Sequence, residues 1–174
     1  IFRKSFMKKI AIIGAGISGL FIANLFRDNQ DYQVTIYEKN NSINIDEGYG
    51  IQLSTNCIKL LNKIGFNTLE NKDRFYPDKI DFYTIKPEKK ICDLNISDFN
   101  SADCKYTTLK RSKLVEFLKD RLKDNIIKYD HSIEKIEKND DQIYLTFNEN
   151  NKEICDHLII SDGVFSKGKS LISN

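Results

Sequence analysis

The stretch that decides the fold is KKIAIIGAGISGLFIANLFRDNQDYQVTIYEK, residues 8–39. Its branched apolar run at Ile10–Ile13 predicts a strand that is buried on both faces. An apolar pattern at helical spacing then predicts a helix from Leu20 to Phe26, and Gln33–Tyr37 predicts a second strand. The order strand, helix, strand indicates a parallel βαβ unit.

The glycines between the first strand and the helix have the spacing of a phosphate-binding loop. Gly14 lets the chain turn sharply, Gly16 leaves room for a pyrophosphate beside the backbone, and Gly19 lets helix and strand pack closely. Free N–H groups and the positive end of the helix dipole favour an anion there. Glu38, 24 positions after Gly14, can accept hydrogen bonds from both hydroxyls of a ribose. Glycines alone also occur in ordinary turns, but the strand, helix and acid together predict a dinucleotide site.

A second interpretation of the same region is a signal peptide or a membrane span, because Arg3, Lys4, Lys8 and Lys9 precede an uncharged run at Ile10–Phe26. At 17 residues this run is short for a spanning helix, and it is interrupted by three glycines. No small-residue cleavage pattern follows it. We therefore expect no transmembrane segment.

Composition limits the kind of protein. A chain of 174 residues that is 40% hydrophobic and 30% charged suits one globular domain with a sizeable core. Its net charge of +2 gives no broad basic face, so we expect no nucleic-acid partner.

The cysteines give little support for a metal site. Cys57, Cys92, Cys104 and Cys155 form no CxxC pair, and the sequence has only two histidines. We expect no bound metal, and reduced thiols in a cytoplasmic protein. Because Gly-x-Ser-x-Gly is absent as well, the catalytic residues stay unknown.

After Glu38 the sequence predicts elements outside a simple βαβ repeat. Asn40–Glu47 is polar and predicts a loop. Ser54-Thr55-Asn56 should supply the cap of a helix that Gly65 ends. Lys79–Ser97 predicts a hairpin, which indicates a second sheet growing out of the nucleotide-binding domain.

A strand-to-helix junction follows. Tyr106–Leu109 predicts a short strand, and an amphipathic helix continues to Leu122. Arg111 stands at the junction, a position that faces ligands in open α/β sheets. The residues alone support a ligand-binding arginine and a solvated one equally.

The following part of the chain predicts a small antiparallel meander with polar turns between its strands. Its β segments are Ile126–Tyr129, His131–Glu137, Gln142–Phe147 and Glu153–His157.

An Asp-Gly pair at Asp162 and Gly163 ends the next predicted strand, Leu158–Ile160, which we expect to be buried. In isolation such a pair favours a tight turn. However, the pair lies between the carboxyl end of a strand and a helix-starting serine, as the first glycine loop lies between a strand and a helix, so it could also face a ligand.

In this order, four stretches resemble the class A FAD-dependent monooxygenases, the family of p-hydroxybenzoate hydroxylase, kynurenine monooxygenase and the ubiquinone-pathway ring hydroxylases. They are GAGISG with Glu38, GYGIQLSTNCIKLLNKIGF, TLKRSKLVEFLKDRL and LIISDGVFSKGKSLI. The resemblance implies an α/β fold: a Rossmann-type FAD-binding domain with an inserted β-hairpin, an antiparallel meander and the start of a substrate-domain sheet.

The resemblance also implies which residues bind FAD. The glycine loop would receive the pyrophosphate and Glu38 the adenosine ribose. Arg111 would contact the ribityl or phosphate portion, Ile133 would lie by the adenine, and the Asp-Gly pair would serve both FAD and the nicotinamide donor. The full set of implied cofactor-binding residues is Gly14, Ala15, Gly16, Ile17, Ser18, Gly19, Glu38, Lys39, Gly50, Arg111, Ile133, Asp162 and Gly163.

By the same resemblance, the protein would use NAD(P)H and O₂ to hydroxylate a small aromatic substrate. The sequence departs from the family pattern at Thr55, Ile160, Ser161, Gly168 and Lys169. Two other functions share the first motif: an FAD-dependent oxidase or dehydrogenase, and a non-catalytic remnant that binds nucleotide weakly or needs a partner chain to complete its sheet.

Domain boundaries follow from the same comparison. Residues 1–6 are expected to be an extension before a natural start at Met7. Residues 7–174 would be the FAD-binding domain, with part of a substrate sheet at about 79–110. Members of the family are about double this length, so we expect the N-terminal half of a longer, truncated or split monooxygenase, with a C-terminal half missing.

Overall fold

The computed structural model describes residues 7–45, 48–124 and 126–172. The predicted extension at residues 1–6 and the end of the predicted loop, residues 46–47, lie outside the described residues. The chain forms two compact units. The first contains the described parts of Ile1–Ile45 and Leu118–Asn174, and the second those of Asp46–Phe117.

A parallel sheet is the centre of the first unit. Its strand order is β11 (His157–Ile160), β1 (Lys8–Ile13), β2 (Tyr32–Tyr37) and β7 (Ile127–Lys128). Helix α1 (Ile17–Phe26) connects β1 to β2. The predicted βαβ unit is therefore confirmed.

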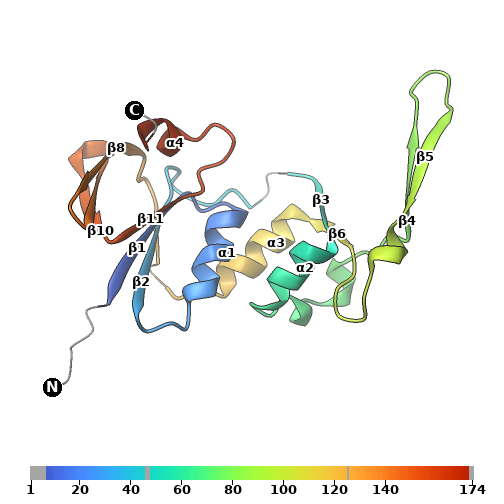
Figure 1. Ribbon diagram of the computed structural model, residues 1–174, viewed down its shortest axis with the longest axis horizontal. Coiled ribbons are helices and arrows are strands. Elements are labelled where there is room, and N and C mark those ends of the chain that lie inside the picture. The colour runs from blue at the N-terminus through green and yellow to red at the C-terminus, as the bar shows by residue number, and fades with distance from the viewer. Residues whose placement is uncertain (1–6, 46–47, 125, 173–174) are drawn as a thin grey trace. The chain divides into compact units, whose positions relative to one another are not determined.

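The two faces of β1 contribute to different parts of the core. Ala11 and Ile13 belong to a cluster with side chains of the antiparallel meander, including Leu145 and Phe147. Ile12, which is fully buried, points to the opposite face because side chains alternate along a strand. Figure 1 shows α1 on one side of the sheet and the meander on the other.

Three antiparallel strands form the meander: β8 (Ile133–Asn139), β9 (Gln142–Phe147) and β10 (Lys152–Cys155). The polar turns between them have residues with positive φ, among them Asp140 and Glu149, as their turn-forming residue types predicted.

Two predictions about this region are wrong. Ile126–Tyr129 was expected in the meander, but β7 pairs in parallel with β2, because the Ile36 and Glu38 amides donate to carbonyls of this segment. Leu158–Ile160 was expected to be buried, but β11 lies at the edge of the sheet and is only partly covered. Side-chain pattern indicates a strand without identifying its partner, which explains both errors.

The second unit contains an antiparallel pair of strands, β3 (Gly50–Leu53) and β6 (Thr107–Lys110), with α2 (Thr55–Asn62) after β3. Helix α3 (Arg111–Asp120) begins at the residue after β6. Short 3₁₀ helices lie at Phe66–Thr68, Asn71–Asp73 and Ile96–Phe99 of this unit and at Asn148–Asn150 of the first.

The predicted ends of α2 are found, with one difference. Gly65 has φ 86°, the left-handed conformation of a glycine stop. Ser54 is the N-cap residue, but it makes no side-chain capping bond. Its hydroxyl contacts the side chain of Asn56 instead, so the predicted cap position is found without a side-chain bond to the helix backbone.

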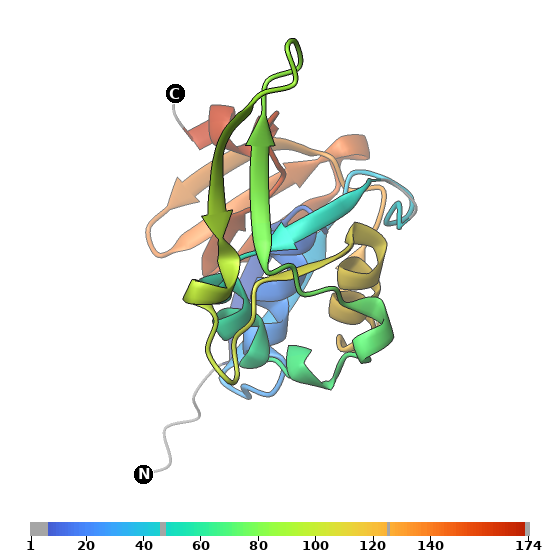
Figure 2. The same cartoon turned by 90° about the vertical axis from the view of Figure 1, so that its right-hand side faces the viewer.

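The predicted hairpin consists of β4 (Lys79–Tyr83) and β5 (Lys90–Asn95). Figure 1 shows it extending clear of the helices of its own unit, and Figure 2 shows its strands side by side. The pairing of its strands places charged side chains on one face and apolar ones on the other. The charged face carries Lys79, Asp81, Lys90 and Asp93, and the apolar face carries Ile80, Phe82, Cys92 and Leu94.

Among the described residues, no helix has both the length and the apolar character needed to cross a bilayer.

Candidate functional site

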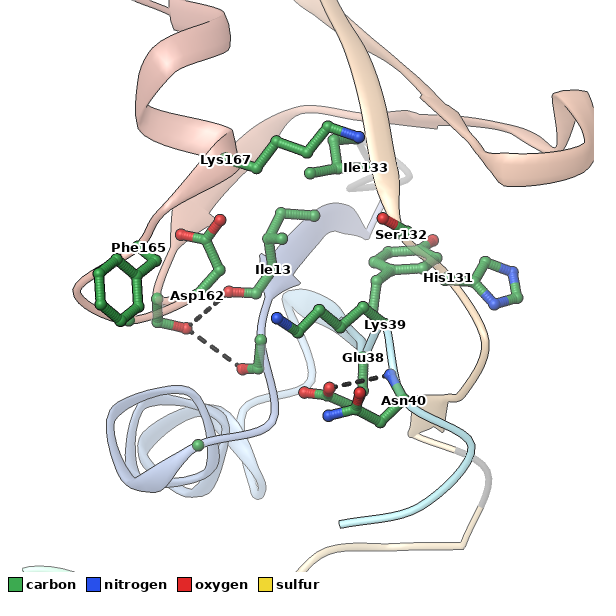
Figure 3. A pocket seen from close by; sticks show the side chains of 15 residues that line it. Ile13, Glu38, Lys39, Asn40, His131, Ser132, Ile133, Asp162, Phe165 and Lys167 are labelled. Atoms are coloured by element: carbon green, nitrogen blue, oxygen red, sulfur yellow. Dashed lines mark hydrogen bonds between the residues drawn. The ribbon is translucent and has the colours of Figure 1, made fainter. Parts of the chain in front are cut away.

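A pocket of about 440 Å³ opens at the carboxyl ends of β1, β2 and β11 in the first unit. Ligands of open α/β sheets bind at this edge. Figure 3 shows Glu38, Lys39 and Asn40 contributing one wall and Asp162 and Phe165 another. The lining residues are Ile13, Gly14, Gly16, Tyr37, Glu38, Lys39, Asn40, His131, Ser132, Ile133, Ser161, Asp162, Gly163, Phe165 and Lys167.

The three glycines of the first loop have the packing that the sequence predicts. Gly14 has φ 99°, and a Cβ there would lie 2.6 Å from the carbonyl oxygen of Ser161. A Cβ on Gly19 would lie 2.0 Å from the carbonyl oxygen of Gly14, so only glycine permits this approach of helix and loop. A Cβ on Gly16 would meet no protein atom within 4 Å. The space beside Gly16 is therefore open for a ligand.

The start of α1 is suited to an anion. Gly16 is the N-cap residue and supplies no capping side chain, and the first turn has no acidic residue. The N–H groups of a helix's first turn lack partners inside the helix, and the dipole adds partial positive charge there. A phosphate group beside Gly16 would satisfy both.

Glu38 is held rigidly at the end of β2. Only 9% of it is exposed, and its Oε2 accepts a hydrogen bond of 2.8 Å from the Ala15 N–H. Its Oε1 accepts one of 3.0 Å from the Asn40 N–H. Each carboxylate oxygen has a further lone pair, so the group remains able to accept from ribose hydroxyls.

The Asp-Gly pair after β11 has features of both its predicted interpretations. Gly163 has φ 87°, as in a tight turn. Asp162 Oδ2 accepts a 2.9 Å hydrogen bond from the Gly168 N–H, at the start of α4 (Lys167–Ile172). Within the described part of the chain, the buried Oδ1 of Asp162 has no hydrogen-bond partner. A buried acceptor without a partner is costly, which favours a ligand donor at this place.

An apolar wall of the pocket is formed by Tyr37, at the end of β2, and Ile133, the first residue of β8, beside His131 of the segment between β7 and β8. The Asp130 and His131 amides donate to the carbonyls of Asn40 and Glu38, which brings this segment to the pocket. Tyr37 stacks on Phe147 with ring centroids 4.5 Å apart, and burial, reinforced by the charge of Glu153, raises the pKa of Tyr37 and keeps the phenol neutral. Such a wall suits an aromatic base.

His131 and Lys167 also line this pocket, although the sequence did not identify them. For His131 the available signal was its place two residues before Ile133, on a segment expected beside the cofactor. Lys167 follows the Asp-Gly pair and the helix-starting Ser166, so its position near a phosphate site could have been inferred. In Figure 3 its side chain extends from α4 toward Ile133.

The predicted site residues fall into three groups by position: the pocket lining, the start of α1 with the residue before it, and the second unit. Gly14, Gly16, Glu38, Lys39, Ile133, Asp162 and Gly163 line the one pocket. Ala15 binds Glu38, and Ile17, Ser18 and Gly19 form the first turn of α1.

Gly50 and Arg111 belong to the second unit. There Gly50 pairs with Lys110, and the Arg111 N–H donates to the Tyr49 carbonyl at 3.1 Å. A Cβ on Gly48 would lie 2.7 Å from Arg111 Cδ, so the arginine side chain passes directly over this glycine.

Taken together, the pocket fits an adenine dinucleotide such as FAD. The bare helix start and the open space at Gly16 suit the pyrophosphate, Glu38 suits a ribose, and the unpartnered Asp162 Oδ1 calls for a donor.

All four cysteines are free thiols. In the part of the chain that the structure describes, no three His, Cys, Asp or Glu side chains are grouped as metal ligands would be.

Comparison with known proteins agrees with this fit. Residues 12–46 match the NAD(P)-binding Rossmann-like domain family. The chain is 26% identical to 6-hydroxynicotinate 3-monooxygenase of Pseudomonas fluorescens over 161 aligned residues. The alignment covers 91% of this chain and 41% of the relative.

Solved structures show the same fold. HpxO of Klebsiella pneumoniae, complexed with FAD and uric acid, matches with a TM-score of 0.76 at 18% identity, over 95% of this chain and 42% of its own. A salicylate hydroxylase in complex with its substrate matches with a TM-score of 0.74 at 17% identity, over 93% and 37%. The chain thus spans about two fifths of the length of these proteins.

Proposed function

We infer that this chain, which is related over nearly all of its length to class A flavin-dependent monooxygenases, is the FAD-binding portion of such an enzyme. The whole protein would use NAD(P)H and O₂ to hydroxylate a small aromatic substrate. The observation that carries the proposal is the convergence of the glycine loop, Glu38 and Asp162 on one pocket at the carboxyl edge of a parallel sheet.

Each wall of the pocket has a part in holding the cofactor. Gly16 and the first N–H groups of α1, at Ile17 and Ser18, bind the pyrophosphate. Glu38 accepts from the ribose, and Lys39 adds a positive charge to the rim. The wall that includes Ile133 covers the adenine. Bound FAD supplies the hydride-accepting and oxygen-activating chemistry, and the protein supplies orientation and electrostatics.

The remaining predicted contacts come from two other places. Asp162 and Gly163 would face the centre of the dinucleotide and the nicotinamide donor. In the second unit, Arg111 and Gly50 would contact the flavin side, with the strands at about 79–110 forming part of the substrate sheet. The aromatic nature of the substrate is supported by the relatives' names, since one acts on 6-hydroxynicotinate and another on salicylate.

One rival from the same cofactor class is an FAD-dependent oxidase or dehydrogenase. The relatives' names favour a monooxygenase. Within this proposal the protein works in the cytoplasm with its thiols reduced, and it has no nucleic-acid partner.

The test is to purify the chain and titrate it with FAD. Stoichiometric binding of yellow flavin, together with a higher unfolding temperature at saturating FAD, is the expected result. A colourless protein that FAD does not stabilise would overturn the proposal and favour a non-catalytic remnant. The FAD-bound chain should then be assayed for NAD(P)H oxidation and for ring hydroxylation of an aromatic substrate. NAD(P)H oxidation coupled to ring hydroxylation is expected of the monooxygenase. Oxidation of a substrate without ring hydroxylation would identify the oxidase or dehydrogenase.

A further inference from the structure

The peptide unit between Gly14 and Ala15 is held at both of its ends. Its N–H, on Ala15, donates to Glu38 Oε2 at 2.8 Å. Its carbonyl, on Gly14, lies 3.3 Å from the hydroxyl of Ser161. One bond comes from the end of β2 and the other from the end of β11, so neighbours on both sides of β1 fix this single peptide plane.

Ser161 is placed for this contact by the strand pairing. Its N–H donates to the Ile13 carbonyl at 2.8 Å, which continues the ladder between β11 and β1. Its hydroxyl lies 3.0 Å from the same carbonyl and 3.3 Å from that of Gly14. A hydroxyl has one proton, so this proton is shared between the last carbonyl of β1 and the first carbonyl of the loop.

The orientation of this peptide plane decides what the loop presents to an anion. With the Gly14 carbonyl turned to Ser161, the loop continues into Gly16 and the free N–H groups of α1. If the plane rotated, a carbonyl oxygen could face the phosphate, and the interaction would become repulsive. Holding the plane before the ligand arrives also removes an ordering cost from binding.

We propose that Ser161 is a positioning residue for dinucleotide phosphates, because its hydroxyl, with Glu38 at the opposite end, fixes the Gly14–Ala15 peptide unit in the phosphate-accepting orientation. The inference rests on the proposed function, since it concerns the same pocket. A purely structural role is already filled by the Ser161 N–H, which joins β11 to β1 without the hydroxyl. Removal of the hydroxyl therefore leaves the strand pairing intact.

The experiment compares Ser161→Ala with the unmodified chain and with Ser170→Ala. Ser170 is a matched control, because its hydroxyl also donates to a carbonyl, that of Lys167, but it is exposed and does not line the pocket. ADP and FAD affinities are measured by calorimetry, below the unfolding temperature of every variant. Amide hydrogen exchange at Ala15 and Ile12 is measured without ligand.

For Ser161→Ala we expect both affinities to fall about three- to tenfold, as the loss of one hydrogen bond implies. Exchange should speed up at Ala15 while Ile12, within β1, stays protected. Ser170→Ala should change neither quantity. If Ser161→Ala binds ADP and FAD as tightly as the unmodified chain does, the inference about Ser161 is overturned and the proposed function is not. Equal acceleration of exchange at both amides would have the same consequence. Absence of FAD binding to the unmodified chain would instead overturn the proposed function.

Discussion

Strand β1 and the β4–β5 hairpin both carry apolar side chains, but these side chains lie in opposite environments. Ile10–Ile13 of β1 are 0–4% exposed. On the apolar face of the hairpin, Phe82 is 47% exposed and Leu94 is 43% exposed. β1 has a strand on each side, whereas β4 and β5 form a two-stranded sheet of their own.

The continuous apolar run of β1 predicted burial on both faces, whereas the alternating pattern of the hairpin predicts a strand without predicting how far its apolar face is covered. Burial of apolar surface contributes about 25 cal/mol per Å², so the strands of the first unit gain stability that the hairpin does not. A two-stranded hairpin is marginally stable by itself. Substitutions should therefore have large effects around β1 and small ones on the hairpin.

The largest contrast is expected between two phenylalanines. Phe147 is fully buried in the core cluster and stacks on Tyr37. Phe147→Ala should lower the free energy of unfolding by about 3–5 kcal/mol, because it leaves a cavity in a packed core. The matched variant Phe82→Ala should cost less than about 1 kcal/mol. Urea unfolding measures both, and similar losses would mean that the hairpin is covered as well as the core.

Two glycines within the first unit provide the next contrast. Gly19→Ala should cost about 1–3 kcal/mol of stability, because its Cβ would lie 2.0 Å from the Gly14 carbonyl oxygen. Gly16→Ala should cost less than about 1 kcal/mol, since no protein atom lies near its Cβ.

For cofactor binding, we expect the order of the two substitutions to be reversed, with Gly16→Ala having the larger effect. Gly16→Ala places a methyl group in the space assigned to the pyrophosphate, so FAD titration should show a weaker complex although the protein stays folded. A Gly16→Ala chain that binds FAD normally would contradict the placement of the pyrophosphate beside this residue.

Glu38→Ala should weaken FAD binding by about 1–3 kcal/mol through lost ribose hydrogen bonds. The substitution also removes the acceptor of the Ala15 N–H, which adds to the loss. Glu134→Ala, an exposed carboxylate on β8, is the matched control and should bind FAD as the unmodified chain does. FAD titration by fluorescence measures both, and equal affinities would remove Glu38 from the site.

The sequence alone predicted the parts of the site that depend on local geometry. Gly14, Gly16, Gly19 and Glu38 have fixed spacings around one βαβ unit, and the structure places them as that spacing requires. Asp162 is distant from them in the sequence, and its position after a strand, together with the resemblance of its segment to the family, indicated that it belongs to the same site.

What the sequence could not predict depends on partners distant in the chain. The position of β7 beside β2 and the edge position of β11 follow from pairing across more than 80 residues of chain. The contact between the Ser161 hydroxyl and the glycine loop joins residues 147–148 positions apart. No local pattern encodes such contacts, because periodicity reports only which face of a strand is apolar.

The smallest effect is expected on the charged face of the hairpin. Hydrogen bonds from Lys79, followed by those from Lys90, lower the pKa of Asp93 to about 2. A depressed carboxyl pKa adds stability above the unfolded value of 3.8, and this stability is lost as the pH falls toward about 2. The group is exposed, so solvent and salt screen most of this contribution. Asp93→Asn should therefore shift the acid-unfolding midpoint only slightly, and the shift should vanish at high salt. A large, salt-resistant shift would show that the hairpin contributes to stability as a buried element does, which would remove its contrast with β1.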